Sequence, residues 1–212
     1  MPWIESPDTD RRRFSHRVLT LAVGGALGLP LLAGCSDKKV SFKSTDVTGA
    51  DYGKTLNLTD AVTGKVRSLD EFRGQVVMLF FGFTHCPDIC PTTLLKARDV
   101  RKALGAQGSK LQVLFVTVDP ERDTPEVMAR YVAAFDPSFI GLRGDEAETR
   151  RATREFKVFH QKVPNRDGSS YTVDHTAASY IIDAQGQLRL FVRHAQPVEE
   201  ITADLKALLA TG

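Results

Sequence analysis

Two of the three cysteines in this chain lie four positions apart, in the stretch Thr-His-Cys-Pro-Asp-Ile-Cys-Pro at 84–91. Cys86 and Cys90 could form a disulfide, act as a redox couple or supply part of a metal site. The common redox motif has two residues between its cysteines, and this one has three. The longer loop still closes a disulfide if the two Cα atoms come within about 7 Å. Two thiolates also make a soft site that suits Cu(I), zinc or an iron–sulfur cluster.

The elements on either side of the cysteines place them at the edge of a sheet. Residues 75–83 form a near-continuous apolar run, which indicates a strand buried on both faces, and residues 111–118 form a second. Between them, residues 91–104 have apolar positions at helical spacing. Cys86 then follows the end of a strand, and Cys90 lies at the start of a helix. The partial positive charge there lowers a thiol pKa and favours metal binding.

The remaining elements predict an α/β fold. They are a hairpin at 54–58 and 65–68, helices at 124–135 and from 145, strands at 158–163 and 170–173, a hairpin at 179–183 and 187–192, and a last helix at 197–209. The first strand–helix–strand unit must be parallel and right-handed. We therefore predict a thioredoxin-like sandwich with an N-terminal β-hairpin and an inserted helix and strand. A doubly wound fold fits the closing hairpin and helix less well.

A metal would need a third ligand, because two thiolates are few for any of these ions. His175 lies just before the strand predicted at 179–183. In a thioredoxin-like sheet that strand runs antiparallel to the first two, so its beginning lies where they end. This topology brings His175 toward Cys86 and Cys90 although 85 residues separate it from Cys90 (175 minus 90). We expect the other histidines to be exposed or engaged in structural hydrogen bonds, namely His16, His85, His160 and His194.

Asp119 ends the second strand and should lie near the same edge. It could hydrogen-bond a group around a metal or on a partner. Equally, Asp119 could cap a turn while Arg122 and Asp123 pair locally.

Many thioredoxin-like reductases carry a cis-proline just before the closing hairpin, and Ala177 takes that place here. The missing proline leaves space above the cysteines, which suits a metal and weakens the case for a general disulfide oxidoreductase.

The N-terminal residues predict export. Residues 1–34 read as a secretory signal, since a basic segment at 11–17 precedes an apolar run. That run ends in Leu-Ala-Gly-Cys at 32–35, which resembles a bacterial lipobox. The resemblance implies cleavage before Cys35, lipid on that cysteine and a membrane-anchored protein facing the periplasm. An uncleaved signal anchor is the alternative. The Arg-Arg-x-Phe pattern at 11–14 also resembles a twin-arginine signal, so the export route stays open.

The rest of the chain divides into a tether and one domain. Residues 35–50 are polar and predict a lipid anchor and tether, and residues 51–212 predict the domain. With 42% hydrophobic and 25% charged residues, the chain can build a globular core. A net charge of +2 argues against nucleic acid as the main partner. No later stretch approaches the length of a membrane span.

Three motifs, in this order, resemble those of the Sco/SenC family. They are Thr-His-Cys-Pro-Asp-Ile-Cys-Pro, then Val-Thr-Val-Asp-Pro-Glu-Arg-Asp-Thr-Pro-Glu at 116–126, then Val-Asp-His-Thr at 173–176. The resemblance runs from about residue 50 to the C-terminus. It implies a thioredoxin-like, membrane-anchored protein that binds copper through Cys86, Cys90 and His175. It also implies a role in assembling the dinuclear copper centre in subunit II of cytochrome c oxidase.

The resemblance leaves several questions open. Some family members are credited mainly with reducing the thiols of that subunit, and some with redox signalling. Other periplasmic copper carriers or thiol reductases are further expected partners. Two thiolates and one imidazole suit Cu(I) in a trigonal, open arrangement, and the family likeness does not settle whether Cu(II) is carried as well. Zinc prefers a fourth ligand, and iron–sulfur clusters need more cysteines. A peroxiredoxin-like peroxidase would share the fold, but its Thr-x-x-Cys signature is absent.

Overall fold

The computed structural model describes residues 41–211, with side chains through Ala210. The strands are β1 Thr45–Asp46, β2 Asn57–Asp60, β3 Val66–Ser68, β4 Val76–Gly82, β5 Leu111–Thr117, β6 Ile140–Arg143, β7 His160–Pro164, β8 Tyr171–His175, β9 Ala178–Ile182 and β10 Leu188–Arg193. The helices are α1 Ile89–Ala103, α2 Pro125–Ala133, α3 Glu146–Glu155 and α4 Val198–Thr211, with short 3-10 turns at Leu69–Phe72 and Gly105–Lys110. Cys35, His16 and the predicted signal at 1–34 lie outside the described residues.

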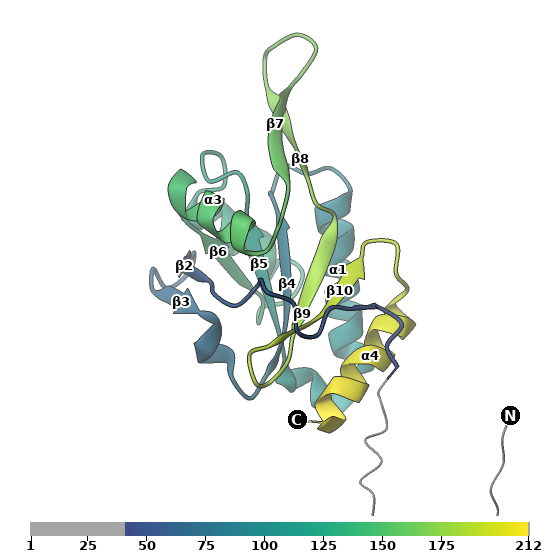
Figure 1. The fold of residues 1–212 in the computed structure, drawn as a ribbon. Helices are drawn as coiled ribbons and strands as arrows, with labels where there is room; N and C mark the ends of the chain where they lie inside the picture. Colours follow the sequence, from purple (N-terminus) through teal and green to yellow (C-terminus); the bar gives the residue numbers. More distant parts are fainter. Residues whose placement is uncertain (1–40, 212) are drawn as a thin grey trace, which may run out of the picture. The chain divides into compact units, whose positions relative to one another are not determined.

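The strands of this described part form a mixed eight-stranded sheet in the order β1-β10-β9-β4-β5-β6-β2-β3 (Figure 1). β4, β5 and β6 run parallel, and β9 runs antiparallel to β4. Because parallel crossovers are right-handed, α1 and α2 lie on the same face of the sheet. These features confirm the predicted thioredoxin-like α/β fold.

β4 is the centre of the core, and all seven of its residues are buried. Its consecutive phenylalanines face opposite sides of the sheet. Phe80 packs against Phe115 at 6.1 Å between ring centroids, whereas Phe81 packs against Phe156 on the other face at 5.5 Å. Each fully buried aromatic or aliphatic side chain contributes about 1.5–3 kcal/mol. A strand covered on both faces explains the continuous apolar run in the sequence.

Two helices begin where their capping residues predicted. The Thr124 side chain accepts the amide hydrogen of Val127 at the start of α2, and Pro125 is its first helical residue. At the start of α3, Asp145 and Glu148 form a capping box, with bonds of 2.7 and 2.8 Å to each other's amides. Caps of this kind involve residues close together in the sequence, so the starts of these two helices could be predicted from the sequence alone.

Two strands were not predicted. β6 is a four-residue strand that contains Gly141, and glycine weakens a strand signal. β1 lies within residues 41–50, which were expected to belong to a tether. Its Thr45 pairs with Phe191 of β10, and the Asp204 carboxylate accepts the amides of Lys43 and Ser44 at 2.8 and 2.7 Å. These residues therefore pack on the domain.

β7 and β8 form a separate two-stranded sheet that projects from the domain (Figure 1). His160 pairs with His175 at its base, and Pro164 pairs with Tyr171 near its tip. Both strands of the hairpin lie one or two residues further along the chain than predicted, so that His175 is the last residue of β8.

No helix among the described residues is both long and apolar enough to span a membrane.

Candidate metal centre

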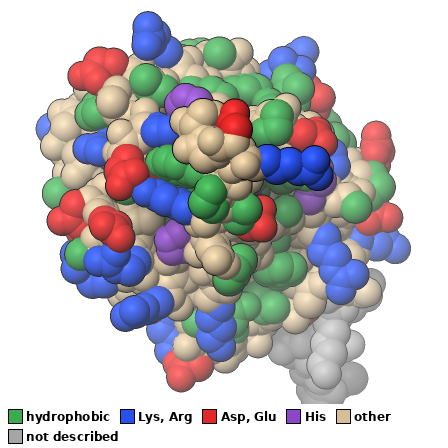
Figure 2. All heavy atoms as spheres, turned by 90° about the horizontal axis from the view of Figure 1, so that it is seen from above, with side chains coloured by type: hydrophobic (Ala, Val, Ile, Leu, Met, Phe, Trp, Pro, Cys, Tyr) green, Lys and Arg blue, Asp and Glu red, His purple; other side chains and the backbone are tan. Residues whose placement is uncertain are grey.

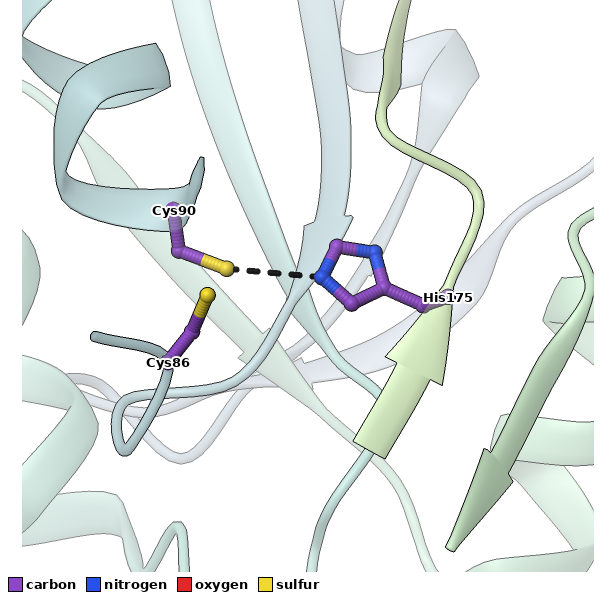
Figure 3. A group of neighbouring side chains, drawn as sticks. All are labelled: Cys86, Cys90 and His175. Atoms are coloured by element: carbon purple, nitrogen blue, oxygen red, sulfur yellow. Dashed lines mark hydrogen bonds between the residues drawn. The ribbon is translucent and has the colours of Figure 1, made fainter. Parts of the chain in front are cut away.

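Cys86, Cys90 and His175 come together at the sheet edge where the sequence placed them (Figure 3). Their ligand atoms, two sulfurs and one imidazole nitrogen, all lie within 4.8 Å of one another. The Sγ atom of Cys90 lies 3.6 Å from Nε2 of His175. In the part of the chain that the structure describes, no other group of three or more His, Cys, Asp or Glu side chains is arranged to hold a metal.

The two cysteines are free thiols that differ in exposure. Cys86 lies in the loop after β4, where its amide donates to the carbonyl of Phe83 at 3.2 Å, and it is partly exposed. Cys90 is fully buried in the first turn of α1, which begins at Ile89, two residues before the helix start at Pro91 that the sequence suggested. Its sulfur packs on Gly82, where an added Cβ would lie only 2.7 Å away.

The two thiols have opposite pKa shifts. A hydrogen bond from Cys90 lowers the pKa of Cys86 to about 5, against desolvation, and the backbone N–H groups of Cys90 and Asp88 assist. The same bond, together with burial, raises the pKa of the Cys90 thiol. The metal-free pair therefore holds one proton between two sulfurs at neutral pH, with the negative charge on the partly exposed Cys86. Such a thiolate is both a nucleophile and a soft ligand.

His175 is oriented by its own chain and by two aromatic rings. Its Nδ1 faces the carbonyl oxygen of Thr176 at 3.1 Å, so Nδ1 carries a hydrogen and Nε2 is the nitrogen that faces the sulfurs. Phe80 and Phe83 pack edge-on against the imidazole, with ring centroids 5.8 and 5.9 Å away. Metal-binding imidazoles are commonly oriented in this way, by a hydrogen bond on the ring nitrogen that does not face the metal.

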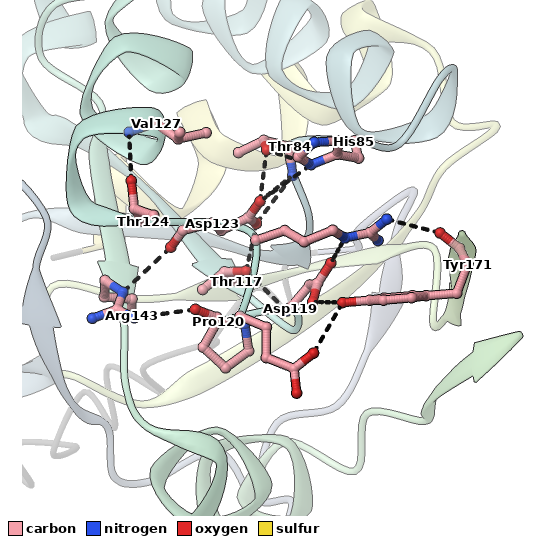
Figure 4. A network of polar contacts seen from close by, with 12 residues as sticks. Thr84, His85, Thr117, Asp119, Pro120, Asp123, Thr124, Val127, Arg143 and Tyr171 are labelled. Carbon is pink, nitrogen blue, oxygen red and sulfur yellow. Dashed lines mark hydrogen bonds and ion pairs between the residues drawn. The ribbon is translucent and has the colours of Figure 1, made fainter. Parts of the chain in front are cut away.

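Asp123, which is fully buried, holds the loop that carries the cysteines (Figure 4). Its carboxylate accepts a hydrogen bond of 2.6 Å from the Thr84 hydroxyl and one of 3.1 Å from the Thr84 amide. The Thr117 hydroxyl at the end of β5 donates a third, also at 2.6 Å. Three donors around one buried carboxylate fix the loop that follows β4 relative to the strand beside it.

Asp119 belongs to the same turn and faces the hairpin (Figure 4). It accepts hydrogen bonds from the Tyr171 hydroxyl at 2.8 Å and from Nε of Arg122 at 2.5 Å. The predicted position at the sheet edge and the predicted turn at Asp119 both occur, but Arg122 pairs with Asp119, whereas the Asp123 carboxylate reaches the distant Thr84. Among the described residues, the hydrogen bonds of the Asp119 amide and carboxylate go to Thr117, Arg122 and Tyr171 and not to the cysteines or His175, so Asp119 lies outside the group of candidate ligands.

The other described histidines make structural contacts. His85 is half-exposed and lies 3.7 Å from the Asp123 carboxylate. His160 pairs across the hairpin with His175, and burial lowers its pKa. The Nδ1 atom of His194 lies 3.0 Å from the Thr93 hydroxyl, which in turn donates to a backbone carbonyl. None of these three histidines joins the group of converging ligand atoms.

Figure 2 looks down onto the hairpin end of the domain. Histidine and hydrophobic side chains lie next to one another on this face, and Lys, Arg, Asp and Glu side chains surround them. Phe159, at the base of the hairpin, is 60% exposed. Basic and acidic side chains are interspersed over this face.

Sequence reasoning missed the contacts of Tyr171 and Arg122. The Arg122 guanidinium lies over the Tyr171 ring, 3.8 Å from its centroid, and Nη1 donates to the Tyr171 carbonyl at 2.8 Å. The two residues are 49 positions apart, so no local pattern links them. The available signal was weak: an aromatic residue in the strand that ends at His175, and an arginine in a turn at the sheet edge.

Comparisons of the sequence with known proteins point to one family. The family model described as SCO1/SenC matches residues 45–210. The mitochondrial SCO2 homolog of Bos taurus is 41% identical over 149 residues, covering 69% of this chain but only 56% of its own length. The SCO2-like protein of Rickettsia felis is 36% identical over 190 residues, covering 86% of this chain and 90% of its own length.

Solved structures show the same fold. ScoI of Bradyrhizobium japonicum, solved with copper bound, is 40% identical and covers 74% of this chain and 99% of its own, with a TM-score of 0.68. A more distant structure at 23% identity and a TM-score of 0.58, BsSco, covers 80% of this chain and 98% of its own. It is described as having a disulfide switch and as a member of the Sco family of cytochrome c oxidase assembly proteins. With the family model matching most of its length, the chain belongs to the SCO1/SenC family.

Proposed function

We propose that this protein is a membrane-anchored, extracytoplasmic copper chaperone that helps to assemble the dinuclear copper centre of cytochrome c oxidase subunit II. The observation that carries the proposal is the convergence of the Cys86, Cys90 and His175 ligand atoms within 4.8 Å. We assign these three residues as the copper ligands. The related ScoI has been solved with copper bound, which supports the choice of metal.

The donor set fits copper better than other metals. Two sulfurs and one imidazole nitrogen are soft to borderline ligands that suit Cu(I) in a three-coordinate site. A structural zinc site would use four ligands, and the described residues offer three in this group. The open position lets a ligand of the recipient protein attack, so copper can pass by ligand exchange. The partial exposure of Cys86 gives that ligand a side from which to approach.

The location and the recipient are part of the same proposal. Residues 1–34 would be a lipoprotein signal and Cys35 the lipid-bearing residue, which would hold the domain at the outer side of a bacterial membrane. Copper and reducing equivalents would come from other periplasmic copper carriers or thiol reductases. Subunit II is proposed as the recipient because the resemblance of the three motifs to the Sco/SenC family implies it.

Copper analysis of the purified, reduced full chain tests this function. We expect one copper per chain, with two sulfurs and one nitrogen by X-ray absorption. In His175→Ala the nitrogen should be lost, whereas in the control His194→Ala, which changes a histidine outside the ligand group, it should remain. Failure of the wild type to retain copper against a modest chelator would refute the chaperone function.

A second function, thiol–disulfide reduction of the same subunit, is favoured by the unequal pKa values of the two thiols. The Cys86 thiolate would attack a client disulfide and form a mixed disulfide, releasing one client thiolate that takes up a proton. Cys90 would then lose its proton and displace the second client thiol, leaving a Cys86–Cys90 disulfide. This step needs both cysteines but not the imidazole. Full client reduction by His175→Ala, without copper binding by the wild type, would favour the reductase.

A further inference from the structure

The turn that follows β5 contacts the two segments of chain that carry the candidate ligands (Figure 4). On one side, the Asp123 carboxylate holds the hydroxyl and amide of Thr84, two residues before Cys86. On the other side, Asp119 and Arg122 hold Tyr171, which begins the strand that ends at the histidine. One short piece of chain therefore links the segment that carries the thiols to the hairpin that carries the imidazole.

This turn is itself firmly built. The amides of Arg122 and Asp123 both donate to the carbonyl of Asp119, at 3.2 and 3.0 Å. The amide of Asp119 donates to the Thr117 hydroxyl at 2.9 Å, and both carboxylates are fully buried. Because its backbone and side-chain groups are paired in this way, the turn moves as one piece. A shift on one side of it therefore displaces the residues that it contacts on the other side.

The hairpin depends on this turn because its two strands are not held by the main sheet. β7 and β8 pair only with each other and not with the eight-stranded sheet. Beyond its base, the hairpin meets the body through the Val173 side chain, which is buried in the core, through Tyr171, and through an ion pair of 2.6 Å between Lys162 and Glu121, a residue of the same turn. The Tyr171 hydroxyl also lies 3.2 Å from the Glu121 carboxylate.

Arg122 connects these contacts to the imidazole through aromatic rings. Its guanidinium lies between the Tyr171 ring, 3.8 Å from the centroid, and the Phe83 ring, at 5.8 Å. Phe83 in turn packs edge-on against His175 at an angle of 87° between the ring planes. The Nη2 atom of Arg122 is buried without a hydrogen-bond partner among the described residues, so the stacked rings are what stabilise that part of the cation.

We propose that Arg122 and Tyr171 are positioning residues that set how long His175 stays on the metal. The inference rests on the proposed copper function and deepens it. With the turn engaged, the imidazole lies against the sulfurs. When the contacts of Arg122 and Tyr171 are lost, the hairpin moves and the metal keeps its two sulfurs but loses its nitrogen. Release of copper to a recipient then starts at the histidine.

The test measures the rate at which the copper-loaded full chain loses copper to a chelator. Outer contacts of metal ligands commonly change metal affinity 10- to 100-fold, so Arg122→Gln should lose copper about ten-fold faster than the wild type. Tyr171→Phe keeps the ring under Arg122 but removes the hydroxyl bonds, and it should lose copper faster by a smaller factor. If Arg122→Gln does not fold, Tyr171→Phe replaces it as the test variant.

Two substitutions serve as matched controls. Tyr52→Phe changes a tyrosine whose ring also contacts a cation, Lys157, at 4.4 Å, and Arg150→Gln breaks an exposed pair with Glu146. Both should release copper at the wild-type rate. A similar acceleration in these controls would overturn the assignment.

The decisive comparison places Arg122→Gln in a His175→Ala background. If Arg122 acts through the imidazole, the second substitution has no further effect on copper loss once the imidazole is gone. A purely structural role would speed copper loss equally in both backgrounds and would overturn the proposal, as would an unchanged rate in Arg122→Gln.

Amide hydrogen exchange of the metal-free protein separates this inference from the copper function. Exchange of the paired amides in β7 and β8 should be about ten-fold faster in Arg122→Gln than in Arg150→Gln, because local opening becomes easier. Unchanged exchange refutes the role of the turn even if copper binds. The wild type could instead bind no copper while hairpin exchange is still faster in Arg122→Gln. That result would refute the proposed function, and the turn would then determine only where His175 is placed.

Discussion

The sulfur of Cys90 lies 3.6 Å from Nε2 of His175, although the two residues are 85 positions apart in the chain. The contact exists because β9 runs antiparallel to β4, so the residues before β9 lie where β4 ends. Cys90 reaches the same place from the first turn of α1. The ligand set therefore depends on the relative direction of two neighbouring strands and on the hairpin placed between α3 and β9.

Alkylation of the reduced, metal-free protein should modify Cys86 and spare Cys90. Because the pKa of Cys86 is lowered to about 5, its thiolate should persist from neutral pH down to about that value, and the rate should fall below it. The measurement is the pH dependence of iodoacetamide reaction, with the modified residue identified by mass spectrometry. In Cys90→Ala the hydrogen bond is lost, so the inflection should move to higher pH. Equal labelling of both thiols in the wild type would contradict the assignment.

Gly82→Ala should disturb the buried thiol. An added Cβ would lie 2.7 Å from the sulfur of Cys90 and 2.8 Å from the Phe80 ring, and neither can move freely in the core. We expect a loss of about 1–3 kcal/mol in the free energy of unfolding. Copper should also bind more weakly. The measurements are urea unfolding and competition with a copper chelator.

The matched control for that substitution is Gly141→Ala in β6. Its nearest contact would be the flexible methyl end of Met128 at 3.1 Å, far from the cysteines. Copper affinity should stay at the wild-type value. Comparable losses of copper affinity in both variants would show that Gly82 has no special relation to Cys90.

Asp123→Ala should destabilise the protein strongly. The substitution leaves the donors of Thr84 and Thr117 without their buried acceptor, at a cost of about 3 kcal/mol. By contrast, Asp70→Ala removes an exposed pair with Arg73 and should change stability by less than about 1 kcal/mol. Urea unfolding at neutral pH provides the comparison. Equal effects of the two substitutions would mean that Asp123 does not hold the cysteine loop.

Asp204→Ala should release the N-terminal end of the described domain. The buried Asp204 carboxylate accepts the amides of Lys43 and Ser44, and β1 follows directly. Without it, hydrogen exchange at residues 43–46 should become faster while exchange in β4 stays slow. Retained protection of β1 would show that its pairing with Phe191 of β10 is sufficient alone.

The features that the sequence predicted correctly share a local or topological cause. The apolar run of β4 reflects burial on both faces, and the starts of α2 and α3 reflect caps within four residues. The approach of His175 to the cysteines follows from strand direction once a thioredoxin-like order is assumed. None of these inferences needs knowledge of a side-chain rotamer.

The features that could not be predicted depend on contacts between distant segments. β6 is short and contains a glycine, so it is recognisable only by its pairing with β5 and β2. The stacking of Arg122 on Tyr171 depends on how the hairpin leans against a turn. Likewise, the helix start near the two cysteines predicted a lowered pKa for both thiols. The hydrogen bond between them instead lowers the pKa of Cys86 and raises the pKa of Cys90.

The separation of the hairpin from the main sheet has a consequence for coordination chemistry. Two of the proposed donors, Cys86 and Cys90, are fixed by β4 and α1, whereas the third, His175, ends a strand that pairs with no strand of the large sheet. A coordination chemist would call such a ligand set hemilabile, with a permanent sulfur chelate and one detachable nitrogen arm. A metal held in this way can change partners at one coordination position without ever becoming a free ion.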